Sequence, residues 1–276
     1  MGGLGNQMFQ YAIGRKLAIL NCTKLKLDLS FINSRNDDLS YTIRDFELGV
    51  FDIKASHTNN FFKKNYFSRM QRALKKFKYI SEPSATFHPQ ILQESGNLYI
   101  DGFWQSELYF KDIRDTLIKD FCFPEDGIPK NHELAHIIRN TNAVSVHIRR
   151  GDYISNSDAY AYHGVCSMDY YQKAIKLAAT WVAHPVFYIF SDDINWVKSQ
   201  LPIKFTHVYI DHNTDKNSYK DLQLMSLCQN HIIANSSFSW WGAWLNQNPG
   251  KKVIAPRQWF LKNSPEDILP QNWLRI

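Results

Sequence analysis

The sequence predicts an α/β protein whose second half forms a parallel sheet. Short apolar runs alternate there with segments of helical periodicity, so that strand and helix follow each other in a regular order. A chain with this alternation places its strands parallel and covers both faces of the sheet with helices. The expected strands are residues 143–149, 186–191, 207–210, 231–234 and 252–255, and the expected helices are residues 168–181, 194–201, 219–228 and 237–246.

The first half of the chain is less regular. Its pattern predicts a helix at residues 7–20, strands at 24–29 and 98–103, and a helix at 106–120. The Pro-containing stretch 121–131 is the expected linker. At 276 residues the chain is long enough for two domains with separate cores. We therefore expect an N-terminal domain at residues 1–125 and a C-terminal domain at residues 132–276.

Composition limits the class of protein. With 44% apolar and 14% aromatic residues, the chain is too hydrophobic for a disordered protein. A net charge of +6 and a pI near 9.0 favour an anionic partner, such as a nucleic acid, a lipid surface or a phosphorylated small molecule. The four cysteines form no C-x-x-C pair, which favours a reducing, cytoplasmic setting. No run approaches the roughly 20 apolar residues of a membrane span, so any membrane contact is expected to be peripheral.

One stretch concentrates positive charge, because no acidic residue stands between Ile53 and Ser81. Apolar side chains at helical spacing predict a basic amphipathic helix there. Two interpretations stay open: the apolar side packs on the core, or the helix contacts an anionic membrane or a lipid-linked acceptor. The basic residues are Lys63, Lys64, Arg69, Arg72, Lys75, Lys76 and Lys78, and the apolar ones are Phe62, Tyr66, Met70, Leu74 and Phe77.

The segment 144–152 brings basic groups to one strand end. Two guanidiniums can hold a diphosphate and stabilise the negative charge that develops as it departs. The chain contains no D-x-D tripeptide to chelate a metal, so arginine could replace the metal here. The alternative is an Arg–Asp ion pair that closes the turn. Strand alternation puts Val144, Val146 and Ile148 on one face and Ser145, His147 and Arg149 on the other, followed by Arg150 and Asp152.

A second polar segment opens the helix expected at residues 237–246. Asn235, Ser236 and Ser237 follow a short strand, and the backbone N–H groups of such a helix start can hold phosphate oxygens. The alternative is an ordinary helix cap. The tryptophans of this helix are expected in the core.

A glycine-rich loop at residues 2–5 runs into the first expected helix. Glycine allows the backbone to come close to a ligand, but the same residues can also form a tight turn. Asn6 and Gln7 add polar groups that a simple turn does not need.

His132, Glu133 and His136 match the H-E-x-x-H pattern of zinc proteases. The usual third ligand lies further along the chain, but the next glutamate is Glu266 and no H-x-x-G-x-x-H extension follows. We therefore interpret the match as accidental and keep a zinc hydrolase as an alternative. This shortage of glutamate leaves Asp or His as the general base from the second domain, with candidates Asp152, Asp169, Asp192, Asp193 and Asp221.

Four segments together resemble the bacterial α-1,2-fucosyltransferases of glycosyltransferase family 11: residues 2–12, 147–152, 190–193 and 235–244. They occur in the family's order over nearly the whole chain. The resemblance implies a GT-B fold, in which two Rossmann-like domains face each other across the active-site cleft. Residues 1–125 would form the acceptor-side domain and residues 132–276 the GDP-fucose-binding domain. It also implies GDP-β-L-fucose as donor, a terminal galactose fucosylated at its 2-hydroxyl as acceptor, and inversion at the anomeric carbon without metal or other cofactor.

The resemblance assigns roles to residues of the first and second motifs. His147, Arg149, Arg150 and Asp152 would form the donor-binding element, with Arg149 bearing most on the β-phosphate. Asn6 would lie near the reacting centre. Arg149, Asp152 and Asn6 are thus the expected catalytic residues, with Asp152 the favoured general base.

The remaining roles fall on the late helices. Ser236, Ser237 and Phe238 would hold phosphate through backbone groups, and Asp221 would read guanine. Family members normally carry a short apolar strand before the glycine loop. Because this chain begins with Met1-Gly2, an inner strand of the N-terminal sheet is expected to be missing.

Other functions stay open beside this one. A GDP-fucose transferase of different linkage is the nearest alternative. A non-catalytic basic protein that binds nucleic acid would need aromatic and cationic residues on one exposed face. The resemblance favours a transferase without a nucleic-acid partner.

Overall fold

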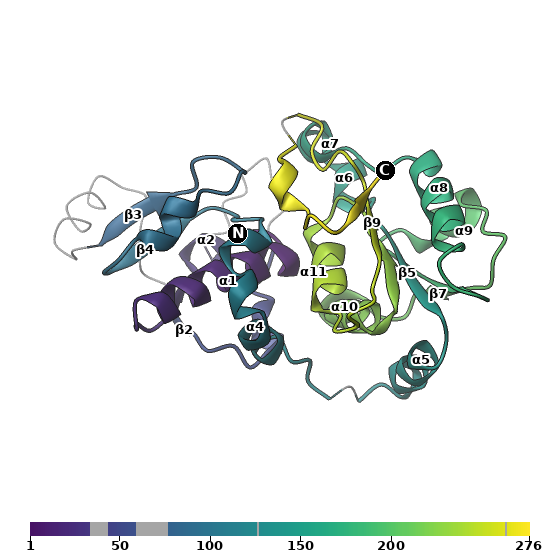
Figure 1. The fold of residues 1–276 in the computed structure, drawn as a ribbon, viewed down its shortest axis with the longest axis horizontal. Helices are drawn as coiled ribbons and strands as arrows, with labels where there is room; N and C mark the ends of the chain where they lie inside the picture. The colour runs from purple at the N-terminus through teal and green to yellow at the C-terminus, as the bar shows by residue number, and fades with distance from the viewer. Residues whose placement is uncertain (34–43, 59–76, 126, 263) are drawn as a thin grey trace. The chain divides into compact units, whose positions relative to one another are not determined.

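The computed structural model describes residues 1–33, 44–58, 77–125, 127–262 and 264–276 (Figure 1). Contacts divide the chain into two compact units: Met1–Phe123 with Pro265–Pro270, and Pro124–Ser264 with Gln271–Ile276. Residues 265–270 therefore pack with the first unit, which the expected boundary of 132–276 did not anticipate. The basic amphipathic helix expected from Phe62 lies almost entirely outside the described residues, and Lys78 begins a strand instead.

The second unit contains one six-stranded parallel sheet. From one edge to the other, its strands are β7(His207–Ile210), β6(Val186–Ser191), β5(Ala143–Ile148), β8(Asn230–Ile232), β9(Val253–Ala255) and β10(Leu274–Arg275). Numbered along the chain, this order is 3-2-1-4-5-6, the Rossmann order. The predicted parallel α/β class is confirmed, while the short edge strand β10 was not predicted.

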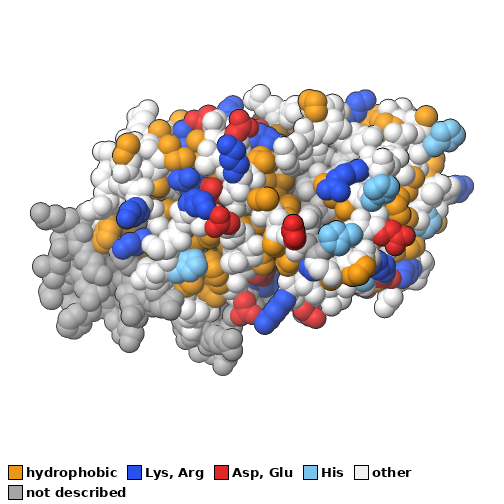
Figure 2. Space-filling model, turned by 90° about the horizontal axis from the view of Figure 1, so that it is seen from below, with side chains coloured by type: hydrophobic (Ala, Val, Ile, Leu, Met, Phe, Trp, Pro, Cys, Tyr) orange, Lys and Arg blue, Asp and Glu red, His pale blue; other side chains and the backbone are white. Residues whose placement is uncertain are grey.

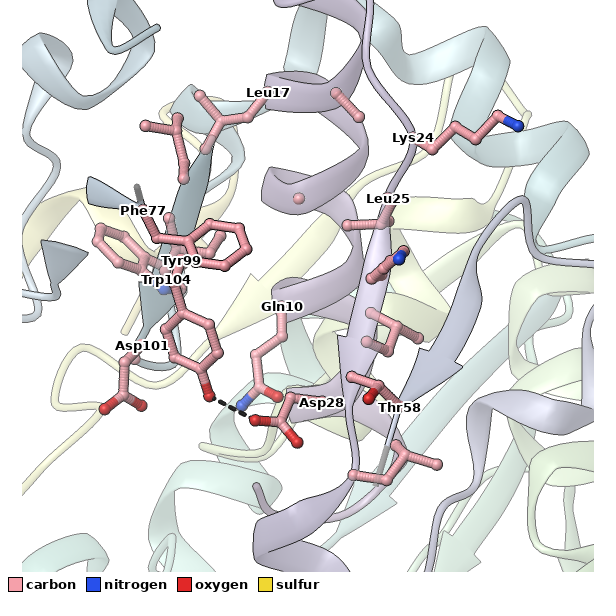
Figure 3. Close-up of a pocket in the computed structure, with 18 of the residues that line it drawn as sticks. Gln10, Leu17, Lys24, Leu25, Asp28, Thr58, Phe77, Tyr99, Asp101 and Trp104 are labelled. Carbon is pink, nitrogen blue, oxygen red and sulfur yellow. Dashed lines mark hydrogen bonds between the residues drawn. The ribbon is translucent and has the colours of Figure 1, made fainter. Parts of the chain in front are cut away.

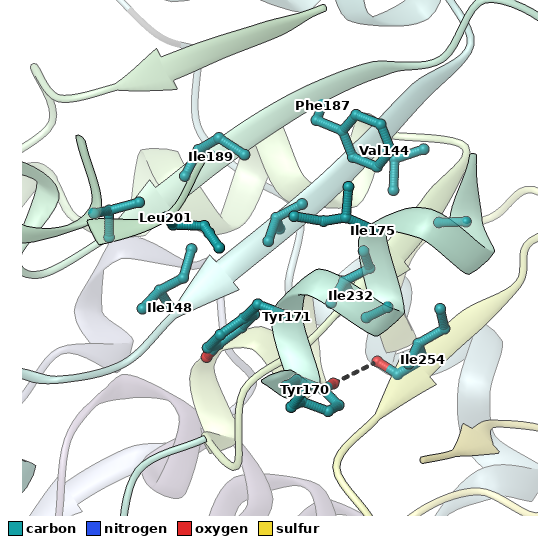
Figure 4. Packing of buried hydrophobic residues seen from close by; sticks show 14 residues of the cluster. Val144, Ile148, Tyr170, Tyr171, Ile175, Phe187, Ile189, Leu201, Ile232 and Ile254 are labelled. Atoms are coloured by element: carbon teal, nitrogen blue, oxygen red, sulfur yellow. Dashed lines mark hydrogen bonds between the residues drawn. The ribbon is translucent and has the colours of Figure 1, made fainter. Parts of the chain in front are cut away.

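Helices cover both faces of this sheet, as the alternation along β5 predicts. Val144, Val146 and Ile148 are fully buried in a cluster with α8(Met168–Ala178) and α9(Ile194–Gln200), shown in Figure 4. On the opposite face, Ala143 of β5 packs with α5(Pro129–Arg139) and α10(Tyr219–Leu227). The expected parity of the strand is therefore correct.

The last helix, α11(Ser237–Leu245), is built into the core. Trp240 and Trp241 are fully buried and Trp244 nearly so, as expected. A Cβ atom added at Gly242 would lie 3.1 Å from Cβ of Met225, so α10 and α11 pack closely at this glycine. None of the described helices has the length and apolarity needed to cross a membrane.

The first unit contains α1(Leu4–Leu20) and two separate pairs of parallel strands. One pair is β1(Lys26–Asp28) with β2(Ser56–Thr58), and the other is β3(Lys78–Ser81) with β4(Leu98–Asp101). Within the described residues, these pairs do not join into one sheet. The short helix α2(Ser30–Asn33) follows β1.

The continuous helix expected at residues 106–120 is wrong. Two 3-10 turns, Glu107–Tyr109 and Lys111–Ile113, precede α4(Arg114–Asp120). Phe110 separates the turns with a φ of −147°, outside the helical range, and its fully buried ring lies 6.0 Å from that of Phe9. Since consecutive Tyr109 and Phe110 are both buried, core packing overrides the local helical pattern.

Candidate functional site

The two polar motifs of the second unit meet where the strand order reverses. β5 and β8 are neighbours in the sheet, with Val146 opposite Ile232. The chain leaves β5 toward β6 on one side and leaves β8 toward β9 on the other. Diverging connections open a crevice at the carboxyl ends of such strands, where ligands of open α/β sheets bind. Arg149 and Arg150 follow β5, and Ser236 follows β8, so both motifs belong to this point.

Both arginines are held by carboxylates that follow β6. Arg149 Nη1 lies 2.8 Å from Asp192 Oδ2, and Arg150 Nε lies 3.4 Å from Asp193 Oδ2. The guanidinium carbon of Arg150 stacks 3.4 Å from the ring centroid of Trp196. The Arg–Asp ion pair considered as an alternative is thus present, but its partners come from the next strand. At 22% and 17% side-chain exposure, both arginines remain accessible to an anionic ligand.

The backbone after β5 also contacts the Asp192 carboxylate. The N–H of Arg150 donates to Asp192 Oδ1 at 2.8 Å. A Cβ atom added at Gly151 would lie 2.5 Å from Asp192 Oδ2, so a side chain at this position would displace the carboxylate. Gly151 begins the short helix α6(Gly151–Ser155), which was not predicted. Asp152 lies on α6, and its side chain is outside the described part of the structure.

His147, near the end of β5, has a buried ring nitrogen without a partner in the described chain. It is 5% exposed, and its ring centroid lies 5.8 Å from that of Phe238 on α11. Burial and, secondarily, the charge of Arg149 lower the pKa of His147 to about 3, so the imidazole is neutral at physiological pH. Its Nδ1 has no hydrogen-bond partner within the described chain. Because buried polar atoms are normally paired, this nitrogen suits a ligand contact.

The N-terminus of α11 has the form of an anion site. Ser236 is the N-cap residue with extended backbone (φ −137°, ψ 125°), yet its side chain makes no capping hydrogen bond. The first N–H groups of the helix therefore receive no side-chain cap from this serine, and the helix dipole favours negative charge there. Ser237 and Phe238, both partly buried, form the first turn.

Asn235 fixes the loop before α11, a role that the sequence did not indicate. Its Nδ2 donates to the carbonyls of His163 at 2.8 Å and Trp259 at 3.2 Å. Its own carbonyl accepts from the hydroxyl of Tyr153 on α6 at 3.3 Å. The loops after β5 and β8 are therefore tied together, and α7(Ser157–His163) is fastened to the same residue.

Asp221 lies in the first turn of α10, at the edge of the sheet where α11 also begins. α10 connects β7 to β8 and α11 connects β8 to β9, and these strands are parallel, so both helices begin on the side of the sheet where the strands end. The Asp221 carboxylate accepts from Asn213 Nδ2 at 2.8 Å, and Asn213 in turn bonds Asn131. Burial raises the pKa of Asp221 to about 7.

Asn6 belongs to the first unit, on α1. Its side-chain oxygen accepts from Gln105 Nε2 at 2.7 Å. Gly2 has a φ of +73°, and an added Cβ would lie 2.4 Å from Asn6 Nδ2. The backbone N–H of Leu4 donates to Glu47 Oε2 at 3.0 Å. The glycine loop is therefore needed for a turn that closes onto Asn6, and a carboxylate of the chain itself caps α1.

The first unit also contains a cavity of about 610 Å³ between α1, β1 and β4 (Figure 3). Leu17, Leu25 and Trp104 contribute apolar walls. The hydroxyl of Tyr99 on β4 donates across it to Asp28 Oδ2 on β1, at 2.9 Å. In the described chain β1 pairs only with β2 and β4 only with β3, so the cavity separates the two strand pairs.

The zinc alternative gains no support from the geometry. His132, Glu133 and His136 are exposed on α5. Over residues 1–33, 44–58, 77–125, 127–262 and 264–276, no group of three or more His, Cys, Asp or Glu side chains is placed to hold a metal ion. The structure thus places the H-E-x-x-H match on the exposed side of α5.

Charges of both signs lie on the face of the described residues that Figure 2 shows. On the face shown in Figure 2, Lys and Arg side chains are interspersed with Asp and Glu over the described residues.

Comparison with known proteins agrees with the geometry. The sequence matches Glycosyl transferase family 11 over residues 1–276. It is 38% identical to an alpha-1,2-colitosyltransferase of Escherichia coli, covering 100% of this chain and 96% of that protein. It is 34% identical to the O-antigen biosynthesis glycosyltransferase WbnK of Escherichia coli, covering 100% and 98%. A galactoside 2-alpha-L-fucosyltransferase of Caenorhabditis elegans is 28% identical, covering 67% and 54%. The chain belongs to glycosyltransferase family 11 and is a glycosyltransferase.

Proposed function

We propose that this glycosyltransferase moves L-fucose from GDP-β-L-fucose to the 2-hydroxyl of a terminal galactose, with inversion at the anomeric carbon. The observation that carries the proposal is the meeting of Arg149, Arg150 and the start of α11 at the strand reversal, a site suited to a diphosphate. The names of two relatives support the α-1,2 linkage. One is an alpha-1,2-colitosyltransferase and the other a galactoside 2-alpha-L-fucosyltransferase, so the two names agree on the linkage although they differ in the donor sugar.

In the proposed reaction the acceptor oxygen attacks C1 of fucose while the bond from C1 to the β-phosphate oxygen breaks. Negative charge grows on the departing GDP and positive charge on the sugar ring. The leaving group would be stabilised by Arg149, Arg150 and the N–H groups of Ser237 and Phe238. Because the negative charge on GDP grows toward the transition state, these interactions become stronger there and accelerate the reaction. The acceptor proton would pass to a carboxylate, for which Asp152 is the proposed base.

A metal is not required for this scheme, because the two guanidiniums supply the positive charge on the diphosphate. Activity is therefore expected to survive EDTA. Asn6 is proposed to contact the reacting sugars from the first unit, and the acceptor is proposed to be an oligosaccharide or a lipid-linked glycan reached from the cytoplasmic side.

A second donor has a specific observation in its favour. The relative at 38% identity is named for colitose, which is L-fucose without its 3-hydroxyl. A site that hydrogen-bonds this hydroxyl would reject the deoxy sugar by roughly 10⁴-fold or more, whereas a site without such a bond would accept both sugars. The donor preference is thus decided by one hydroxyl.

The test is a GDP-release assay with GDP-fucose and GDP-colitose, each with galactose-terminated acceptors, with and without EDTA. We expect acceptor-dependent release from GDP-fucose that persists in EDTA, and a product whose linkage by NMR is α-1,2. A preference for GDP-colitose would replace GDP-fucose as the assigned donor. GDP release at the same rate with and without acceptor would contradict transfer to galactose-terminated acceptors.

Donor affinity is expected to increase as the pH rises through about 7. At that pH Asp221 loses its proton, and only the carboxylate can accept both N–H groups of the guanine edge. KM for GDP-fucose should therefore fall between about pH 6 and pH 8. Asp221→Asn, which cannot ionise, should bind the donor more weakly and without this pH dependence, while KM for the acceptor is unchanged.

The same carboxyl affects stability in the opposite direction. Its folded pKa lies above the ordinary value of 3.8, so the unfolded chain releases the proton first as the pH rises. Its contribution to stability is therefore lost between about pH 4 and pH 7. Urea unfolding of Asp221→Asn should show a smaller loss over this range. Equal pH dependence in both proteins, for donor KM and for stability, would remove Asp221 from this role.

A further inference from the structure

We infer that Asp192 is the positioning residue of the arginine pair, a role that rests on the proposed diphosphate binding by Arg149. One carboxylate reaches two consecutive residues: Oδ2 pairs with the Arg149 guanidinium and Oδ1 accepts the backbone N–H of Arg150, both at 2.8 Å. It thereby fixes the side chain of one arginine and the backbone from which the other extends.

The topology explains why this carboxylate is in the right place. β5 and β6 are parallel neighbours, with Ile148 opposite Ser191, so the residues that follow each pair lie side by side at the carboxyl edge. Arg149 and Asp192 are the first residues after that pair. Gly151 then allows the carboxylate to approach, since any Cβ there would collide with Oδ2 at 2.5 Å.

The two neighbouring carboxylates have different functions. Asp193 Oδ1 accepts the backbone N–H of Trp196 at 3.2 Å and caps α9, which carries the ring on which Arg150 stacks. Over the described residues, the ion pair and the hydrogen bond of Asp192 both go to the arginine segment, and its side chain is only 23% exposed. Because both of its oxygens are engaged by positive or N–H groups, Asp192 acts through Arg149 and is not the general base, although its residue type made it a candidate.

A positioning role predicts a particular kinetic pattern. Asp192→Asn keeps the shape and can still accept the N–H of Arg150, but it loses the charge that orients Arg149. We expect kcat to fall about 10-fold or more, as for one hydrogen bond to a charged group. Donor KM should not rise, because the substitution also removes a negative charge beside the diphosphate.

The deciding experiment is a double-mutant cycle of Asp192→Asn with Arg149→Ala. If Asp192 acts through Arg149, its substitution should change kcat less than about twofold once Arg149 is absent. An equal loss of kcat in both backgrounds would overturn the inference, as would a rise in donor KM at unchanged kcat. If Arg149→Ala does not fold, as judged by circular dichroism, Arg149→Gln provides the second background.

The control is Asp211→Asn. Asp211 directly follows β7 in the same sheet and pairs with Lys198 at 2.9 Å, so it matches Asp192 in chemistry and position but lies outside the site. Its kcat should equal that of the wild type.

Failure of the proposed function is detected separately by running the same cycle on GDP binding, measured by calorimetry. We expect the effect of Asp192→Asn on the Kd of GDP to differ at least about fivefold between the two Arg149 backgrounds. Such coupling without turnover of either GDP-sugar would discard the donor assignment and keep the positioning role. Additive effects on Kd would discard the positioning role.

Discussion

Arg149→Ala is expected to lower kcat by about 10²-fold or more, the usual cost of removing one preorganised donor to a developing charge. Arg149 sits at the end of a fully buried strand, and its guanidinium is already oriented by Asp192 before any ligand arrives. It therefore needs little reorganisation when the diphosphate leaves. Steady-state GDP release, at saturating donor and acceptor, measures the effect.

The same experiment separates catalysis from structure. If the Arg149–Asp192 pair served only to close the turn, Arg149→Ala would lower the melting temperature and leave kcat per folded molecule close to normal. Arg149→Lys should restore part of the rate, because it keeps the charge but loses the planar fork of donors. The control is Arg139→Ala, an exposed arginine on α5 outside the site. Near-normal turnover of Arg149→Ala would refute the assignment.

The second unit could be predicted well because its inner strands β5, β8 and β9 are buried on both faces. All six residues of β5 are buried, and the five strands that were predicted begin and end within two residues of the expected bounds. Continuous apolar runs and helical periods are local properties, so a sequence displays them directly. The site followed from the same pattern, since the polar residues after β5 and before α11 come where parallel strands end.

What the sequence did not reveal depends on contacts between distant residues. Asp192 and Asp193 are the partners of the two arginines. Asp193 lies 43 positions after Arg150 in the sequence, and the register of β5 with β6 brings the two residues together. A pair of carboxylates directly after a neighbouring strand was the available indication. The broken helix before α4 had no local indication, because burial of Tyr109 and Phe110 decides it.

Trp240→Ala is expected to destabilise the protein by about 3–5 kcal/mol, the range for removing a large buried aromatic side chain. Trp240 is fully buried, and its ring lies 5.1 Å from Trp241, 6.0 Å from Trp244 and 5.5 Å from Trp273. Trp273 immediately precedes β10, so the lost ring also weakens the attachment of the last strand to α11. Urea unfolding followed by circular dichroism gives the free energy without relying on tryptophan fluorescence.

Leu274→Ala is the matched control, because Leu274 adjoins Trp273 in the chain but is 44% exposed. Its substitution should change the free energy of unfolding by no more than about 0.5 kcal/mol. Although α11 begins at the proposed phosphate site, a loss of stability can be distinguished from a loss of GDP binding. Trp240→Ala should reduce the folded fraction, and molecules that stay folded should keep their Kd for GDP. A stability within about 1 kcal/mol of wild type would mean that the neighbouring rings collapse into the space and that the aromatic cluster is not what fixes α11.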